Sequence, residues 1–116
     1  MDSKKLLELA VKACDDKRAE EILAINVKDI SGITDYYLIC HANSDRQVQA
    51  IAREVKDQAH KNGLDVNRLE GFNEARWILI DLGDVVVHVF HKEERGYYNL
   101  ERLYRDAEFI EFEQVD

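Results

Sequence analysis

The spacing of apolar residues predicts two amphipathic helices in the first half of the chain. Between Ser3 and Asp16, apolar side chains recur every three or four positions with charged residues between them, which is typical of a surface helix. A second stripe runs between Ser44 and Gly63 and consists of Val48, Ile51, Ala52, Val55 and Ala59. Ser44 is a suitable N-cap, Gln47 completes a capping box, and Gly63 suits the left-handed position that ends a helix.

Shorter apolar runs predict strands on either side of a loop. Leu23, Ile25 and Val27 alternate with smaller or polar residues, as in a half-buried strand. Residues 36–40 are apolar on both faces, which indicates a central strand. The intervening residues 29–34 form the loop.

Two further strands are predicted as a hairpin. Residues 77–82 and 85–90 are separated only by Gly83 and Asp84, and so short a connection joins antiparallel strands. An extended piece near residues 65–70 follows the second helix, and this strand-helix-strand order predicts a right-handed parallel crossover. The sheet is therefore predicted to be mixed.

The end of the chain is predicted to form a short helix and then an acidic tail. The apolar positions of this helix are Leu100, Leu103, Tyr104 and Ala107. The chain has 116 residues, no proline and scattered glycines, so we find no linker and expect one domain over residues 1–116. Its fold class is α/β, a mixed sheet with flanking helices.

Composition narrows the class of protein. Apolar residues make up 46% and charged residues 34% of the chain, which excludes a disordered chain of low hydrophobicity, and no apolar run is long enough to span a membrane. The first residues lead into an amphipathic segment rather than an export signal. Cys14 and Cys40 lie among apolar neighbours, so we expect buried, reduced thiols and a cytoplasmic protein.

The charge balance favours a protein partner. There are 24 acidic and 16 basic side chains and a formal net charge of −8, which opposes non-specific attraction to nucleic acids or anionic membranes. Tyr36, Tyr37 and Trp77 provide aromatic rings without the basic neighbours that RNA recognition requires. We therefore expect a basic protein as the partner, and neither nucleic acid nor membrane.

Tests for catalytic chemistry give no positive result. His88 and His91 are three apart along a strand and point to opposite faces, so they cannot share a metal ion without a bulge. No glycine-rich phosphate loop is present in the sequence. Asp81 and Asp84 flank the hairpin turn but are not paired on one face. We expect no metal, no cofactor and no catalytic residue.

What remains is a possible interaction surface near the hairpin and the last predicted helix. Its large apolar residues are Trp77, Leu82, Tyr97, Tyr98, Leu100 and Leu103. Aromatic and leucine clusters around loops commonly anchor protein interfaces. Simple packing in the core is an equally good interpretation of the same residues.

Five segments, taken in order, resemble the ribosomal silencing factor family, also called Iojap-related proteins. They are residues 34–39 (TDYYLI), 44–48 (SDRQV), 70–71 (EG), 77–90 (WILIDLGDVVVHVF) and 95–104 (RGYYNLERLY). The resemblance covers nearly the whole chain. Its most specific parts are the hairpin and the Tyr-x-Leu-Glu-x-Leu ending.

The resemblance implies a nucleotidyltransferase-like fold without a catalytic site. It also implies binding to the large ribosomal subunit through its universal L-fourteen protein, a steric block of subunit association, and damped translation when nutrients are scarce. The residues that match the family's partner-binding surface are Trp77, Leu82, Tyr98, Asn99, Leu100 and Leu103. One departure is Gly83, where some relatives carry proline, and a looser turn there would weaken the presentation of Leu82.

Two alternatives remain open at this point. One is an active nucleotidyltransferase that uses Asp81 and Asp84 with magnesium. The other is an assembly module of the ribosome, for which a homodimer would hide the same aromatic patch until a partner competes for it.

Overall fold

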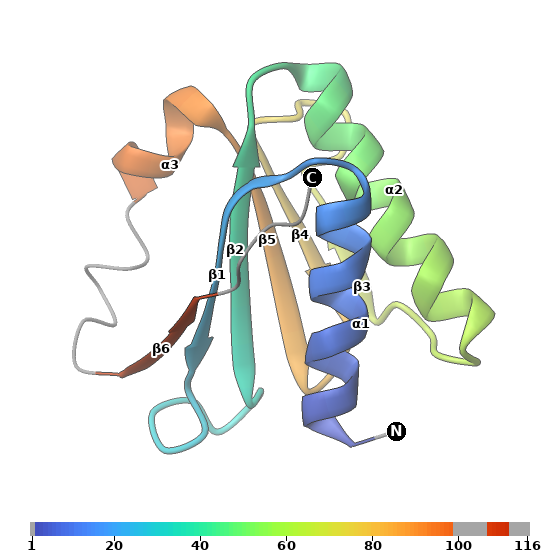
Figure 1. The fold of residues 1–116 in the computed structure, drawn as a ribbon, viewed down its shortest axis with the longest axis vertical. Coiled ribbons are helices and arrows are strands. Elements are labelled where there is room, and N and C mark those ends of the chain that lie inside the picture. The colour runs from blue at the N-terminus through green and yellow to red at the C-terminus, as the bar shows by residue number, and fades with distance from the viewer. Residues whose placement is uncertain (1, 99–106, 112–116) are drawn as a thin grey trace.

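The computed structural model describes residues 2–98 and 107–111 of the chain. In chain order, its elements are α1 (Ser3–Asp16), β1 (Glu20–Asn26), β2 (Tyr36–Ala42), α2 (Asp45–Lys61), β3 (Arg68–Glu70), β4 (Trp77–Asp81), β5 (Val85–His91), α3 (Lys92–Tyr98) and β6 (Glu108–Glu111). The strands form a six-stranded sheet in the order β3-β4-β5-β2-β1-β6 (Figure 1). The predicted α/β class is confirmed.

Strands β2 and β5 form the centre of the sheet. They pair in parallel from Tyr36 opposite Val85 to Ala42 opposite His91, while the other neighbouring strands pair antiparallel. The predicted mixed sheet and hairpin are therefore confirmed. The parallel neighbour of β2 is β5, however, and β3 lies at the sheet edge beside β4.

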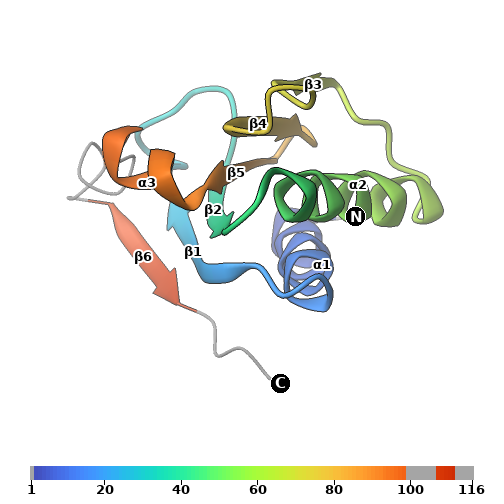
Figure 2. The same cartoon turned by 90° about the horizontal axis from the view of Figure 1, so that it is seen from above.

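The helices cover the two faces of the sheet unequally. Helices α1 and α2 lie on one face and the short α3 lies on the other (Figure 2). The larger core is formed between the sheet and the first two helices, with fully buried side chains such as Leu38, Ile51 and Val87. A smaller cluster on the opposite face consists of Ile25, Val27, Ile39 and Phe90.

The ends of α2 show why this segment is helical. The Ser44 hydroxyl oxygen accepts a hydrogen bond from the Gln47 N–H, as the predicted N-cap requires. The Gln47 side chain does not complete the capping box; it donates to the Lys17 carbonyl instead and ties α2 to the connection after α1. Gly63 has φ +76° and its N–H donates to the His60 carbonyl, the expected left-handed ending.

The last part of the chain differs from its prediction. Residues 92–98 form α3 directly after β5, where a connection was expected. The acidic segment expected as a solvated tail contains β6, which pairs antiparallel with β1 and places Phe109 opposite Ile25. Backbone pairing stabilises such an edge strand whatever its charge pattern. The predicted helix over Leu100, Leu103 and Tyr104 lies outside the described residues, and Ala107 lies in a bend.

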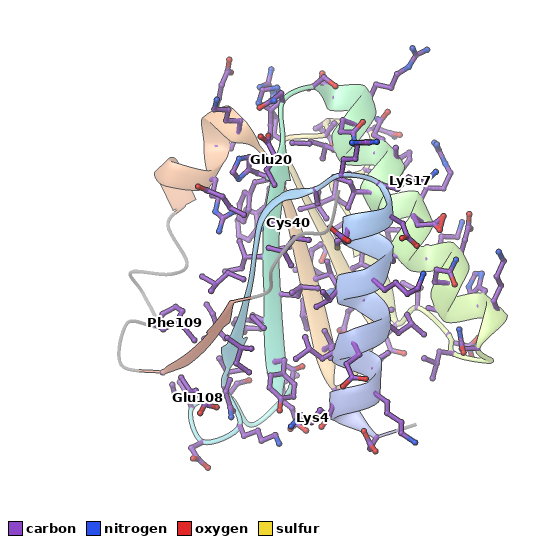
Figure 3. All side chains as sticks on the ribbon, viewed as in Figure 1. Lys4, Lys17, Glu20, Cys40, Glu108 and Phe109 are labelled. Carbon is purple, nitrogen blue, oxygen red and sulfur yellow. The ribbon has the colours of Figure 1, made fainter. Side chains whose placement is uncertain are left out.

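The two cysteines are buried free thiols, as predicted. Cys14 on α1 and Cys40 in the middle of β2 (Figure 3) have their sulfur atoms 3.9 Å apart. The hydrogen bond with Cys40, and then burial, raise the pKa of the Cys14 thiol. The thiol form is therefore strongly favoured, and this pair acts as part of the apolar core.

Replacing Gly71 with alanine is expected to destabilise the fold. Gly71 has φ +77°, and a Cβ atom there would lie 2.2 Å from the Trp77 carbonyl oxygen. The unfavourable φ alone costs about 1–3 kcal/mol, and the clash adds to it. Urea denaturation of Gly71→Ala measures the loss. Gly32→Ala is the matched control, because nothing lies within 4 Å of its Cβ position; equal midpoints for the two variants would contradict this account.

Candidate protein-binding site

Four aromatic rings lie together on the sheet face that α1 and α2 leave uncovered, and we call Tyr37, Trp77, His88 and Phe90 the aromatic cluster. Trp77 on β4 lies directly opposite Phe90 on β5, and their rings stack with centroids 5.3 Å apart. The His88 ring meets Tyr37 edge-on at 5.1 Å. Cross-strand aromatic pairs of this kind stabilise a sheet beyond their buried area.

His88 fixes the orientation of the tryptophan. The Trp77 indole Nε1–H donates to His88 Nδ1 at 2.9 Å. Because Nδ1 accepts this bond, the neutral imidazole carries its proton on Nε2. This Nε2 atom is buried without a hydrogen-bond partner in the described part of the chain. Burial lowers the pKa of His88 to about 4, so the ring is neutral at physiological pH.

Trp77 and Leu82, both predicted partner-binding residues, are not brought together. Trp77 is half-buried at the start of β4 in the aromatic cluster. Leu82 follows the other end of β4, is only 6% exposed and packs in the core under the helices. Five positions separate the two residues, and an odd offset along a strand places side chains on opposite faces.

The turn after Leu82 explains how Gly83 is accommodated. Gly83 has φ +96° at the first central position of the two-residue turn, as in a type II′ hairpin. Its N–H donates to Asp81 Oδ1 at 2.9 Å. Proline has neither this φ nor an N–H, so the turn differs in geometry from a proline-containing one.

The other predicted partner-binding residues fall at or beyond the end of α3. Tyr98 is the last residue of α3, while Asn99, Leu100 and Leu103 lie outside the described residues. Helix α3 follows β5 directly, at the end of the sheet where Trp77 begins β4.

Sequence reasoning missed the most exposed apolar side chains. Among the residues whose side chains are described, these are Ile30 and Ile33 in the loop between β1 and β2, at 54% and 86% exposed, and Phe109 on β6, at 37% (Figure 3). The loop lacks any periodic pattern that would have separated exposed from buried positions. The hydrogen bond between Trp77 and His88 was missed as well, although a histidine within an apolar strand was a usable signal.

One carboxylate of the enzyme alternative, Asp81, and one histidine considered as a metal ligand, His91, make local contacts. Asp81 accepts the Gly83 N–H in the turn. His91 points away from His88, with its Nε2 atom 3.9 Å from Asp45 at the start of α2. Within residues 2–98 and 107–111, no three His, Cys, Asp or Glu side chains are placed to hold a metal ion. Nor does any helix of this part have the length and apolar character needed to cross a membrane.

These features define an α/β protein with two helices on one sheet face, and the aromatic cluster and the short α3 on the other. The family model described as "Ribosomal silencing factor during starvation" matches residues 1–116. The ribosomal silencing factor RsfS of Bacillus subtilis (strain 168) is 66% identical over 107 residues, which cover 92% of this chain and 91% of the relative. The chloroplastic protein Iojap of Zea mays is 34% identical, over 95% of this chain and 49% of that protein.

Solved structures agree with these relatives. A crystal structure of a protein from Bacillus halodurans has a TM-score of 0.85 and 58% identity, covering 94% of this chain and 99% of that one. An X-ray structure of a protein from Chromobacterium violaceum has a TM-score of 0.89 and 30% identity, covering 90% and 88%. The chain belongs to the ribosomal silencing factor family, and its role is regulatory and linked to the ribosome.

Burial of His88 predicts a loss of stability in acid. The unfolded chain takes up a proton at this histidine near pH 6.5, whereas the folded protein does so only near pH 4. Between these values the unfolded state binds more protons than the folded state. The free energy of unfolding therefore falls by roughly 3 kcal/mol as the pH drops from about 6.5 to about 4. Above this range His88 does not affect it.

Urea denaturation across this pH range measures the effect. His88→Gln is the comparison, because the glutamine oxygen accepts the indole N–H but does not titrate. The wild-type curve is expected to be steeper than that of the variant, and parallel curves would show that His88 is not the responsible group.

Proposed function

We propose that this protein is a cytoplasmic translational repressor that binds the large ribosomal subunit through its universal L-fourteen protein. By occupying that site it blocks association with the small subunit and damps translation when nutrients are scarce. The observation that carries the proposal is the match to the ribosomal silencing factor family over residues 1–116. The identity of the ribosomal protein follows from the resemblance of the motifs.

The aromatic cluster supports a contact through the sheet face opposite α1 and α2. Trp77 is half-buried there, held by its stacking on Phe90 and its bond to His88. An aromatic side chain that is fixed before binding loses little conformational freedom in a complex, which makes it an effective anchor. We propose Trp77, Tyr98, Asn99, Leu100 and Leu103 as the main contact residues, with Leu82 acting mostly through its packing beneath the turn.

Charge supports a basic protein as the partner. The net charge of −8 attracts a basic ribosomal protein and repels the surrounding ribosomal RNA. Acidic side chains flank the proposed contacts: Glu93 on α3 is exposed and pairs with Arg76 at 3.2 Å, and Glu108 is exposed on β6. Such charges suit the polar rim of an interface.

The size of the protein supports a steric mechanism. Its principal dimensions are 34 × 33 × 28 Å. Subunit joining brings two preformed surfaces into direct contact, and a folded body of this thickness bound to one of them keeps the other away. Occupancy alone is sufficient for this mechanism, and no chemical step is required.

Substitution of Trp77 by alanine is expected to weaken binding to purified large subunits by more than about 1 kcal/mol, as for an interface hot spot. Co-sedimentation measures this loss. Phe72→Ala is the matched control, because Phe72 is a partly buried aromatic residue that packs on the helix side, where Arg53 lies over its ring.

Leu103→Asp tests the proposed contact at Leu103 by the same co-sedimentation measurement. Unchanged binding by folded Trp77→Ala and Leu103→Asp would overturn the proposed contacts.

The repressor mechanism makes a separate prediction about subunit joining. Added in excess to purified large subunits, the protein is expected to reduce formation of joined ribosomes, measured by light scattering after small subunits are added. Trp77→Ala should restore joining in proportion to its loss of binding. Normal joining by large subunits that are saturated with the protein would exclude the steric mechanism even if binding is tight.

A further inference from the structure

A buried polar cluster attaches α3 to the sheet. The Arg95 side chain on α3 is only 10% exposed, and its Nη1 atom donates to the Glu21 carbonyl at 2.7 Å and to His41 Nδ1 at 2.9 Å. These two bonds account for both Nη1 hydrogens. Helix α3 has seven residues, and a helix this short depends on tertiary contacts for its stability.

An irregularity in β1 makes the Glu21 carbonyl available to Arg95. The register between β1 and β2 shifts between Glu20 and Leu23, and Glu21 has φ +49°. This left-handed conformation is unfavourable for a residue other than glycine and persists only where surrounding contacts hold it. Bulges commonly redirect backbone groups in this way. Figure 3 shows Glu20 at the end of the sheet beside α3.

The contact with His41 depends on the protonation of its ring. Arginine only donates hydrogen bonds, so Nδ1 of His41 must be unprotonated to accept from Arg95. The ring proton is then on Nε2, which lies 3.8 Å from a Glu20 carboxylate oxygen. A proton on Nδ1 would replace the acceptor with a donor and place a cation against the guanidinium.

Among the described residues, the charged groups that act on His41 come from β1 and α3. Strand β1 provides the carboxylates of Glu20 and Glu21, each 3.8 Å from the ring, and α3 provides Arg95 and, with a smaller effect, Lys92. On β5, the residue opposite is the uncharged Phe90. Burial, and then Arg95, lower the pKa of His41 below its ordinary value, while the two carboxylates oppose this shift.

We propose that Arg95 is a positioning residue that holds α3 on the sheet more firmly while His41 is neutral, so that acidification loosens α3 and weakens binding through the segment that begins at Tyr98. The contacts of Arg95 with the Glu21 carbonyl and, at 3.8 Å, with the Glu21 carboxylate do not depend on His41. The loosening of α3 is a property of the isolated protein. The effect on binding rests on the proposed function, in which that segment contacts the large subunit.

Hydrogen exchange in the isolated, full-length protein tests the loosening of α3. Protection factors for residues 92–98 are compared in wild type, Arg95→Gln and His41→Gln from about pH 7.5 to about pH 4.5, a range that spans the ordinary histidine pKa. We expect α3 of wild type to lose protection in acid and α3 of Arg95→Gln to be unprotected at every pH. His41→Gln keeps a hydrogen-bond acceptor that does not titrate, so its α3 should stay protected in acid. Protection of α2 reports that each variant is folded.

Arg76→Gln is the matched control for this measurement. Arg76 also contacts α3, through Glu93, but this ion pair is exposed, and such pairs contribute little. The protection factors of α3 in Arg76→Gln should therefore equal those in wild type. Equal protection in Arg95→Gln and wild type, or a parallel loss in wild type and His41→Gln on acidification, would overturn the proposal.

Co-sedimentation with large subunits tests the effect on binding. At neutral pH, Arg95→Gln is expected to bind roughly ten-fold more weakly, the loss typical of one hydrogen bond from a charged group, and binding by His41→Gln should depend less on pH than wild-type binding. Unchanged binding by Arg95→Gln despite an unprotected α3 would overturn the positioning role and leave the proposed function intact. No binding by wild type would instead refute the proposed function, and exchange alone would then decide whether His41 controls α3.

Discussion

The parallel pairing of β2 with β5 constrains the rest of the structure. Seven consecutive residue pairs join these strands, every residue of β5 is buried, and β2 is buried except at Tyr37. A strand pair buried on both sides needs cover on each face of the sheet. Helices α1 and α2 provide it on one face. On the other, part of the cover comes from the aromatic cluster and the short helix α3.

The difference between the two sheet faces bears on the role of this family at the ribosome, because it leaves the aromatic cluster on the face opposite α1 and α2. On the face opposite α1 and α2, Phe90 and His88 are buried, and Tyr37 and Trp77 are half-buried. Trp77 is fixed there by stacking and by a hydrogen bond. In the proposed complex, the net negative charge of the chain attracts a basic protein and repels the RNA around it. The proposed block by occupancy needs a rigid body and an anchored surface. The described residues supply a packed core between the sheet and two helices, and a Trp77 ring held in place by its neighbours.

The face opposite α1 and α2 also carries a buried polar contact between a helix and the sheet. Helix α3 is attached through the Arg95 guanidinium rather than through a long apolar stripe. Polar attachment is directional and depends on the protonation of its acceptor, whereas apolar packing does not. In the proposed switch, protonation of His41 therefore loosens the polar attachment of α3, while the apolar packing of α1 and α2 does not respond to it.

The sequence by itself determined the elements whose signals are local. The apolar stripes of α1 and α2, the caps at Ser44 and Gly63, and the hairpin around Gly83 depend on neighbouring residues, and the structure has them where they were predicted. The motifs were also sufficient to indicate the family. Only the tertiary structure decided that β2 pairs with β5, that an acidic segment forms β6, that Leu82 packs under the helices and that Trp77 bonds to His88. Each of these depends on contacts between residues that the strand order brings together, and no local pattern encodes that order.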